Sequence, residues 1–182
     1  DWSSDVCSSD LGNPVLFKVA TTGVRPMSFS ASNLPEGLQI ASETGIITGS
    51  VKKRGNYEVL LTAKNKLGEA SKKLLIKIGD TIALTPPIGW NGWNSWEAHI
   101  DQEKVLASAN AMVNMGLKDH GWNYVNIDDA WQGIRDPKSL ALQPNEKFPD
   151  IKGMIDYIHS LGLKAGLYSR SEERRVGKEC LR

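Results

Sequence analysis

Residues 121–133 read GWNYVNIDDAWQG, and they are the most informative part of the chain about its architecture. Residues 124–127 predict a strand that begins shortly after Gly121. Two adjacent carboxylates, Asp128 and Asp129, come directly after this strand. In parallel α/β domains, side chains that carry out chemistry gather at the carboxyl ends of the strands, so this pair is a candidate for function.

Helical patterns lie on both sides of this strand. Apolar residues three and four positions apart predict a helix over residues 105–117, with Asp101 as its cap. A second amphipathic helix is predicted over residues 151–161, and short strands at 88–90 and 163–168 complete the series. The order βαβαβ indicates parallel strands with helices outside, and both a barrel and a doubly wound sheet fit it.

The chain before residue 81 has a different pattern. Apolar residues alternate with other types over residues 57–63 and 74–78, which is the period of a strand. Turn-forming Gly, Pro and Asn recur every few positions across residues 12–80. Short strands at this spacing predict a small all-β sandwich. The basic run at residues 52–54 is interpreted as a solvated turn.

A proline-containing connector separates the two patterns. Residues 12–84 contain ten Lys or Arg, five Asp or Glu and no Trp. Residues 85–169 contain seven Lys or Arg, ten Asp or Glu and five Trp. The junction Thr85-Pro86-Pro87 is stiff and disfavours helix. We therefore predict a multidomain chain, with an all-β module at residues 12–80 and an α/β domain at residues 81–169.

Composition excludes several classes of protein. The 182 residues are 40% hydrophobic and 24% charged, with a formal net charge of +1. These values are typical of globular domains and give no basic surface for nucleic acid. No apolar run reaches the roughly 18 residues that a membrane helix needs. We therefore predict neither a nucleic-acid partner nor a membrane span.

The two ends of the chain differ from everything between them. Residues 1–11 read DWSSDVCSSDL and residues 170–182 read RSEERRVGKECLR, and neither has helix or strand periodicity. Both strings resemble translated sequencing-adapter DNA, so we expect them to be artefacts that flank a fragment. The two cysteines, Cys7 and Cys180, lie in these ends and therefore say nothing about redox compartment. The absence of a signal peptide is then no evidence about location.

Aromatic and acidic side chains gather at the predicted strand ends. They are three tryptophans spaced by three, the carboxylate pair and a tyrosine after the third strand: Trp90, Trp93, Trp96, Asp128, Asp129 and Tyr168. In a parallel barrel these strand ends share one rim, where active sites lie. Flat indoles suit the apolar face of a sugar, and carboxylates accept paired hydrogen bonds from its hydroxyls. The combination indicates a carbohydrate pocket.

Plainer interpretations compete with this one. Tryptophan clusters often form partly buried core, and adjacent carboxylates can cap a turn or bind metal. Metal is disfavoured because neighbouring strand residues point to opposite sides and no third ligand has suitable spacing. The same geometry disfavours the pair as catalytic acid and base. The scattered histidines His99, His120 and His159 are interpreted as surface residues or as residues whose hydrogen bonds are satisfied. The sequence contains no Gly-rich phosphate loop that would indicate a cofactor.

Three motifs bring the second domain close to a known family. They are TPPIGWNGWNSW at 85–96, GWNYVNIDDAWQG at 121–133, and QPNEKFPD at 143–150 with the segments that follow it. Together they are similar to glycoside hydrolase family 27, the α-galactosidases, over residues 83–169. Residues 12–79 resemble the Ig-like modules of bacterial surface and secreted proteins. The resemblance implies a small Ig-like sandwich followed by the first three βα units of an incomplete (β/α)8 TIM barrel.

The resemblance also implies roles for individual residues. Trp93 matches the family tryptophan that packs against galactose. Asp128 and Asp129 match the pair that hydrogen-bonds the 4- and 6-hydroxyls of the sugar. Tyr168 matches a tyrosine that lines the same subsite. All four residues are therefore expected to bind substrate.

Three features depart from the family pattern. Gly92 stands where Ser is commoner, and Ala130 stands where many members carry a disulfide-forming Cys. The family is a retaining glycosidase with two catalytic carboxylates, and these lie on strands four and six. The sequence expected to be native ends at the third strand. No catalytic residue is therefore expected in this chain, and the fragment is expected to be inactive.

The sequence thus predicts part of a retaining α-galactosidase. Such an enzyme releases terminal α-linked galactose from oligosaccharides, polysaccharides or glycoconjugates, without a cofactor or metal, and the resemblance implies a periplasmic or secreted location. Two alternatives stay open. A non-catalytic carbohydrate-binding or adhesion protein would use the β module, although it has no need of a carboxylate pair at a strand end. A related glycosidase would act on β-L-arabinopyranosides, α-N-acetylgalactosaminides or isomaltodextran.

Overall fold

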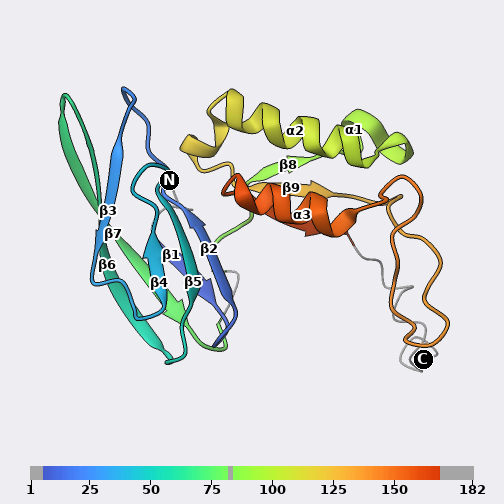
Figure 1. Ribbon diagram of the computed structural model, residues 1–182, viewed down its shortest axis with the longest axis horizontal. Helices are drawn as coiled ribbons and strands as arrows, with labels where there is room; N and C mark the ends of the chain where they lie inside the picture. Colours follow the sequence, from blue (N-terminus) through green and yellow to red (C-terminus); the bar gives the residue numbers. More distant parts are fainter. Residues whose placement is uncertain (1–5, 82–83, 169–182) are drawn as a thin grey trace.

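The computed structural model describes residues 6–81 and 84–168, which form two modules joined by a connector (Figure 1). The first module is built from β-strands alone. The second module packs helices on a small parallel sheet. This is the order of modules that the sequence predicts.

The first module consists of two sheets. A four-stranded sheet has the order β1-β7-β6-β3, and a three-stranded sheet has the order β2-β5-β4. The strands are β1 Val6–Ser9, β2 Pro14–Lys18, β3 Ser28–Ser32, β4 Leu38–Ile40, β5 Ile46–Ser50, β6 Gly55–Asn65 and β7 Gly68–Ile78. The predicted all-β sandwich is therefore confirmed.

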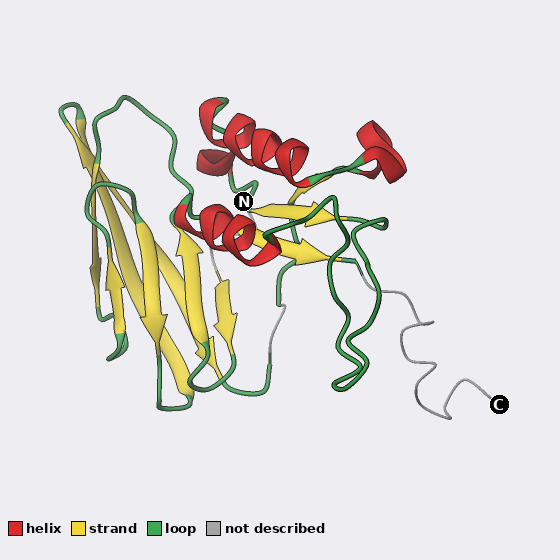
Figure 2. Cartoon of the chain, turned by 45° about the vertical axis from the view of Figure 1, so that its right-hand side comes forward, coloured by secondary structure: helices red, strands yellow, loops and turns green. Residues whose placement is uncertain are grey.

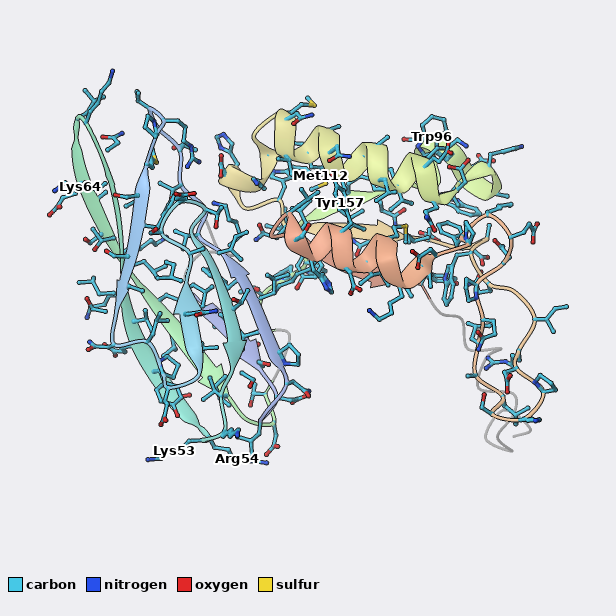
Figure 3. All side chains as sticks on the ribbon, viewed as in Figure 1. Lys53, Arg54, Lys64, Trp96, Met112 and Tyr157 are labelled. Atoms are coloured by element: carbon cyan, nitrogen blue, oxygen red, sulfur yellow. The ribbon has the colours of Figure 1, made fainter. Side chains whose placement is uncertain are left out.

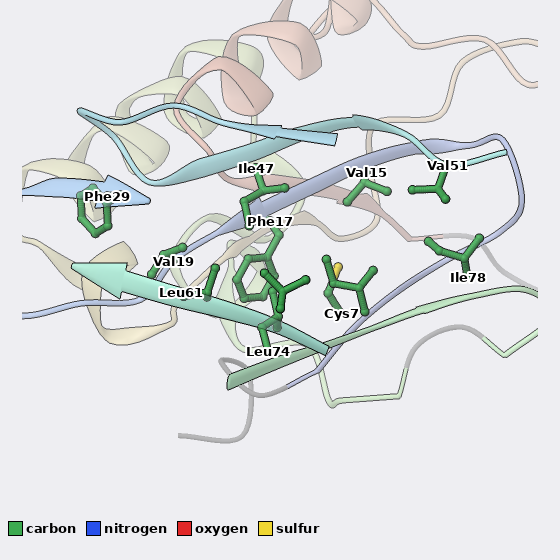
Figure 4. Close-up of a cluster of buried hydrophobic side chains, with 12 residues drawn as sticks. Cys7, Val15, Phe17, Val19, Phe29, Ile47, Val51, Leu61, Leu74 and Ile78 are labelled. Atoms are coloured by element: carbon green, nitrogen blue, oxygen red, sulfur yellow. The ribbon is translucent and has the colours of Figure 1, made fainter. Parts of the chain in front are cut away.

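The core of the sandwich follows from the alternation of its strands. Ile47, Leu74 and Ile76 are completely buried, and Phe17 lies with them between the two sheets (Figure 4). Between Leu74 and Ile76, the side chain of Leu75 is only partly buried. Apolar residues at every second position thus face the core, because successive side chains of a strand point to opposite faces.

Strand β1 lies in the segment for which the sequence predicts no periodic structure. Its residues pair in parallel with residues 75–78 of β7, and Cys7 is buried in the core. The sandwich therefore includes residues before position 12, where the sequence predicts that the module begins. The edge of β7 offers unpaired backbone groups, and pairing with them requires no side-chain alternation. The adapter origin stays a prediction, and residues 1–5 and 170–182 lie outside the described part of the chain.

A close backbone approach in the first module requires glycine. Gly49 has a φ of +129°, and a Cβ built on it would overlap the carbonyl oxygen of Gly37. We expect Gly49→Ala to lower the free energy of unfolding of this module by roughly 2–4 kcal/mol, because it adds both backbone strain and steric overlap. Denaturant unfolding measures the loss.

Gly68→Ala is the matched control for this prediction. Gly68 also has a positive φ, +151°, but nothing lies within 4 Å of its Cβ position. The Gly68→Ala variant should therefore lose only the part of the free energy of unfolding that comes from backbone strain. Equal losses in the two variants would contradict the steric explanation for Gly49.

The second module is a three-stranded sheet with the order β10-β9-β8, in which both neighbouring pairs are parallel. The strands are β8 Gly89–Asn91, β9 Tyr124–Ile127 and β10 Lys164–Leu167. The longer helices are α2 Gln102–Asn114 and α3 Ile151–Ser160, and the shorter ones are α1 Trp93–Trp96, η2 Glu97–His99 and η3 Leu117–His120. Figure 2 shows the two longer helices beside the sheet. The predicted order βαβαβ is confirmed.

Side-chain caps begin both longer helices. The Asp101 carboxylate accepts a hydrogen bond from the backbone N–H of Lys104 at 2.9 Å, which confirms the predicted cap. Asp150 accepts in the same way from the N–H of Gly153 at 2.9 Å. Helix α2 ends at Asn114, three residues before its predicted end, because Gly116 adopts a left-handed conformation with a φ of +75°.

The two faces of the parallel sheet have opposite character. Val125 and Ile127 are buried in a cluster with side chains of α2 and α3. Tyr124 and Asn126 alternate with them and are only partly buried. The ammonium group of Lys164 lies 5.2 Å from the centre of the Tyr124 ring, so the face away from the helices is largely polar.

The two longer helices also contact one another. The Tyr157 hydroxyl of α3 donates to the Asn110 amide oxygen of α2 at 2.7 Å. Figure 3 labels Tyr157 on α3. None of the helices within residues 6–81 and 84–168 combines the length and the apolar character that crossing a membrane requires.

Candidate active-site rim

The carboxyl ends of the three parallel strands meet at one edge of the sheet, which we call the rim. Asn91 of β8 is in register with Asn126 of β9, and Ile127 of β9 is in register with Leu167 of β10. The residues that follow these strands therefore lie side by side. They are the residues that the sequence predicts to bind substrate: Trp93, Asp128, Asp129 and Tyr168.

The carboxylate pair is held in a turn at the rim. The Asp128 Oδ1 atom accepts the backbone N–H of Asp129 at 2.8 Å, and Asp129 Oδ1 accepts the N–H of Ala130 at 2.9 Å. Ala130 has a φ of +72° and turns the chain away from the strand direction. Strand β9 ends at Ile127, so the pair lies beyond it. The argument from strand alternation about where these carboxylates point therefore does not apply.

Asn91 is a rim residue that sequence reasoning missed. Its side-chain amide donates to Asp128 Oδ2 at 2.9 Å, and its amide oxygen accepts the backbone N–H of Trp93 at 2.9 Å. One side chain therefore links the first strand end to the carboxylate of the second. The sequence feature that could have indicated Asn91 is its position as a polar residue between Trp90 and Gly92, at the end of the first strand.

The three tryptophans spaced by three have different environments. Trp90 packs against the core cluster of the second module, so the plainer interpretation is correct for this residue. Trp93 and Trp96 each remain 39% exposed, and Figure 3 shows Trp96 on α1. Lys104 lies 5.4 Å from the Trp96 ring. Trp93 is thus the exposed indole that directly follows the first strand end.

Gly92 allows Trp90 to pack in this way. A Cβ built on Gly92 would lie 2.6 Å from the ring of Trp90 and 3.0 Å from the side chain of Ile100. A serine at this position therefore requires the indole to shift. The departure from the family pattern is consistent with the packing of this chain.

Tyr168 is held at the rim by its backbone. Its N–H donates to the carbonyl of Ile127 at 2.9 Å, and its carbonyl accepts the indole N–H of Trp131 at 3.0 Å. Trp131 is 7% exposed, whereas the Tyr168 side chain remains 39% exposed. Trp131 therefore has a structural role, and it leaves the tyrosine accessible beside the carboxylate pair.

The chain between β9 and α3 forms a long loop that leaves the rim (Figure 2). Its two arms are joined where Gln132 pairs with Pro144. Within it, Asp136 accepts backbone hydrogen bonds from Ser139 at 2.7 Å and from Lys138 at 3.0 Å. These bonds hold the pKa of the Asp136 carboxyl below its ordinary value, and the hydrogen bonds from Ser139 contribute most. The loop is therefore ordered from within.

The described residues do not assemble an evident metal site. Across residues 6–81 and 84–168, no three His, Cys, Asp or Glu side chains lie close enough to hold an ion together. The histidines are distributed over η2, η3 and α3. What the rim does offer is hydrogen-bond acceptors beside exposed aromatic rings. This combination suits the hydroxyls and the apolar face of a sugar.

Two family matches cover most of the chain. Residues 85–177 match the family described as "Alpha galactosidase A", which is about half of the chain. Residues 3–79 match the family described as "Putative Ig domain". The two matches coincide with the two modules of the fold.

Curated relatives and solved structures agree with these matches. "Probable alpha-galactosidase B" of Neosartorya fischeri is 46% identical over 99 residues, which is 52% of this chain and 22% of that protein. "Alpha-galactosidase A" of Cellvibrio japonicus is 42% identical over 91 residues, which is 50% of this chain and 22% of that protein. The chain thus spans about a fifth of these relatives.

A solved structure from Bacteroides fragilis matches both modules. It is described as a "putative alpha-galactosidase", and it superposes with a TM-score of 0.86 at 45% identity over 91% of this chain and 36% of that one. The parallel sheet is accordingly the first part of a (β/α)8 barrel rather than a doubly wound sheet. With an Ig-like module ahead of the opening strands of an α-galactosidase barrel, the chain belongs to glycoside hydrolase family 27.

Proposed function

We propose that the complete polypeptide is a retaining α-galactosidase and that this chain supplies part of its galactose subsite. The observation that carries the proposal is the carboxylate of Asp128, fixed by Asn91 at a rim that also holds Trp93 and Tyr168. The substrate is a carbohydrate with terminal α-linked galactose. The names of the curated relatives support this choice.

The rim residues have separate tasks in this proposal. Asp128 and Asp129 accept hydrogen bonds from two hydroxyls of the sugar, and such charge-assisted bonds are about twice as strong as neutral ones. Trp93 packs its ring on the apolar face of the sugar, and Tyr168 closes the side of the subsite at the third strand. These contacts orient the glycosidic carbon for attack, which lowers the entropic part of the barrier.

Bond cleavage needs two further carboxylates. In a retaining glycosidase, one carboxylate forms the covalent glycosyl intermediate and the other protonates the leaving group. The two carboxyl groups lie about 5–5.5 Å apart. By family resemblance, these residues lie on the fourth and sixth strands of the barrel. The present chain therefore binds and positions the sugar, whereas the reacting carboxylates come from the remainder of the barrel.

We also propose that the complete protein acts outside the cytoplasm, in the periplasm or secreted. The support is the Ig-like module, which resembles modules of bacterial surface and secreted proteins. Fractionation of the source cells, with detection by an antibody against residues 12–80, tests this location. Detection in the cytoplasmic fraction alone would contradict it.

A panel of aryl glycosides tests the activity of the complete polypeptide. We expect kcat/KM to be highest on the α-galactoside, with the released sugar keeping its anomeric configuration. The β-L-arabinopyranoside and α-N-acetylgalactosaminide, together with isomaltodextran, distinguish the related specificities. A preference for one of these would correct the substrate, and hydrolysis with inversion would exclude the proposed mechanism.

A further inference from the structure

The Ig-like module packs against the end of the parallel sheet that lies opposite the rim. A cavity of about 80 Å³ lies between the modules, and its lining includes Phe17 and Lys18 of the first module and Gly121, Tyr124 and Lys164 of the second. These last residues precede or begin β9 and β10. Asp128 and Tyr168 follow the same two strands, so the module contacts the amino-terminal end of the sheet and not the candidate subsite.

One carboxylate of the second module binds two cations of the first. Asp119, in η3, has one oxygen 3.2 Å from the ammonium of Lys18 and the other 2.7 Å from the guanidinium of Arg25. The Lys18 side chain is only 3% exposed, and that of Asp119 is 22% exposed. The Lys18–Asp119 pair is therefore largely withdrawn from solvent, whereas the Arg25 side chain is 42% exposed.

The surroundings of Lys18 explain why this contact matters. The ammonium donates to the carbonyl of Val19 at 2.7 Å and lies 5.3 Å from the ring of Phe29. Burial lowers the pKa of Lys18, and the carboxylate of Asp119 acts in the opposite direction. A buried ammonium without a charged partner is strongly unfavourable. Its charged partner here comes from the other module.

A second contact depends on shape instead of charge. Gly162, in the turn after α3, has a φ of +79°, and a Cβ built on it would lie 2.9 Å from Ile46 of β5. The turn that leads into β10 thus lies directly against the three-stranded sheet of the sandwich. The interface therefore contacts the segments before both β9 and β10.

The same arrangement occurs in the Bacteroides fragilis structure. A TM-score of 0.86 over 91% of this chain requires both modules to be placed alike in the two proteins. Two modules joined by a loose linker would not be expected to share their relative position. The docked arrangement is therefore shared by the two proteins.

We propose that the Ig-like module is an intramolecular support for the barrel, and that its partner is the amino-terminal end of the parallel sheet, held through Asp119. The amino-terminal end of a barrel contributes to stability, whereas its carboxyl end carries the active site. The module thus stabilises the segments from which β9 and β10 start. This role does not depend on the substrate proposed above.

Backbone hydrogen exchange of the complete polypeptide, followed segment by segment, tests the support. In the unaltered polypeptide, we expect protection at residues 14–18 and at residues 121–125. Asp119→Leu leaves the Lys18 ammonium buried without its partner, so exchange should become at least about tenfold faster in both segments. Arg25→Ala removes the more exposed pair and should give a smaller change in the same two segments.

Two further variants separate docking from local damage. Lys18→Met combined with Asp119→Leu removes the stranded charge and should restore most of the protection in both segments, because an apolar pair can replace a buried ion pair. Asp156→Asn breaks the exposed pair with Lys152 on α3 and should change neither segment.

Three results would overturn the proposal. The first is an unaltered chain in which residues 121–125 exchange without protection. The second is an Asp119→Leu variant in which exchange changes only in the second module. The third is a double variant that recovers nothing relative to Asp119→Leu. If Asp119→Leu is insoluble, an Arg25→Ala variant that changes exchange in neither segment would overturn the proposal in its place.

Discussion

Replacing Asp128 by asparagine in the complete polypeptide should lower kcat/KM on an aryl α-galactoside by at least about tenfold. A hydrogen bond to a charged group contributes about 1.5–3 kcal/mol, and an amide cannot replace the carboxylate at full strength. The fold should persist, because the amide oxygen can still accept from Asn91 and only the local bond from the Asp129 N–H is lost. Asp129→Asn should have a similar effect.

Steady-state kinetics with thermal unfolding as a parallel measurement checks this prediction. Asp156→Asn is the matched control, since Asp156 forms an exposed pair on α3, away from the rim. It should leave both kcat/KM and the unfolding temperature unchanged. If kcat/KM of Asp128→Asn equals that of the unaltered enzyme, Asp128 is not part of the subsite. A loss of kcat/KM that accompanies a lower unfolding temperature would instead reflect damage to the rim.

The 182-residue chain on its own should show no α-galactoside hydrolysis above background. Its described part holds one parallel sheet of three strands, and the resemblance places both catalytic carboxylates on later strands. Without them, neither the covalent intermediate nor protonation of the leaving group can occur by the family route. This is the largest effect that we expect, because it removes the chemical step itself.

Assay of the purified chain against the complete polypeptide at equal concentration measures this difference. The decisive control is the chain with Asp128→Asn, which distinguishes intrinsic activity from a contaminating enzyme. Hydrolysis that purifies with the chain and falls in this variant would contradict the mechanism. It would require a catalytic pair within residues 1–182.

Much of the rim could be predicted from local patterns. Asp128 and Tyr168 each follow a short apolar strand, and the strands alternate with amphipathic helices. Parallel strands place their carboxyl ends at the same edge. The order of elements alone therefore predicts that these residues lie together at one edge of the sheet.

The state of individual side chains could not be predicted in this way. Trp90, Trp93 and Trp96 have the same spacing, yet Trp90 packs on the core while the other two remain exposed. Their difference depends on which face of the strand and of α1 each one occupies. The link from Asn91 to Asp128 joins residues 37 positions apart, so no local pattern reveals it.

Periodicity and composition alone determined two modules, the sandwich, the βαβαβ order and the carboxylates at the strand ends, because each rests on residues close in the chain. Only the tertiary structure decided that β1 pairs with the edge of β7 and that Lys18 forms an ion pair with Asp119. Both contacts depend on surfaces that exist only after each module has folded. An unpaired strand edge and a buried cation each need a partner from elsewhere, and the sequence does not say which one comes within reach.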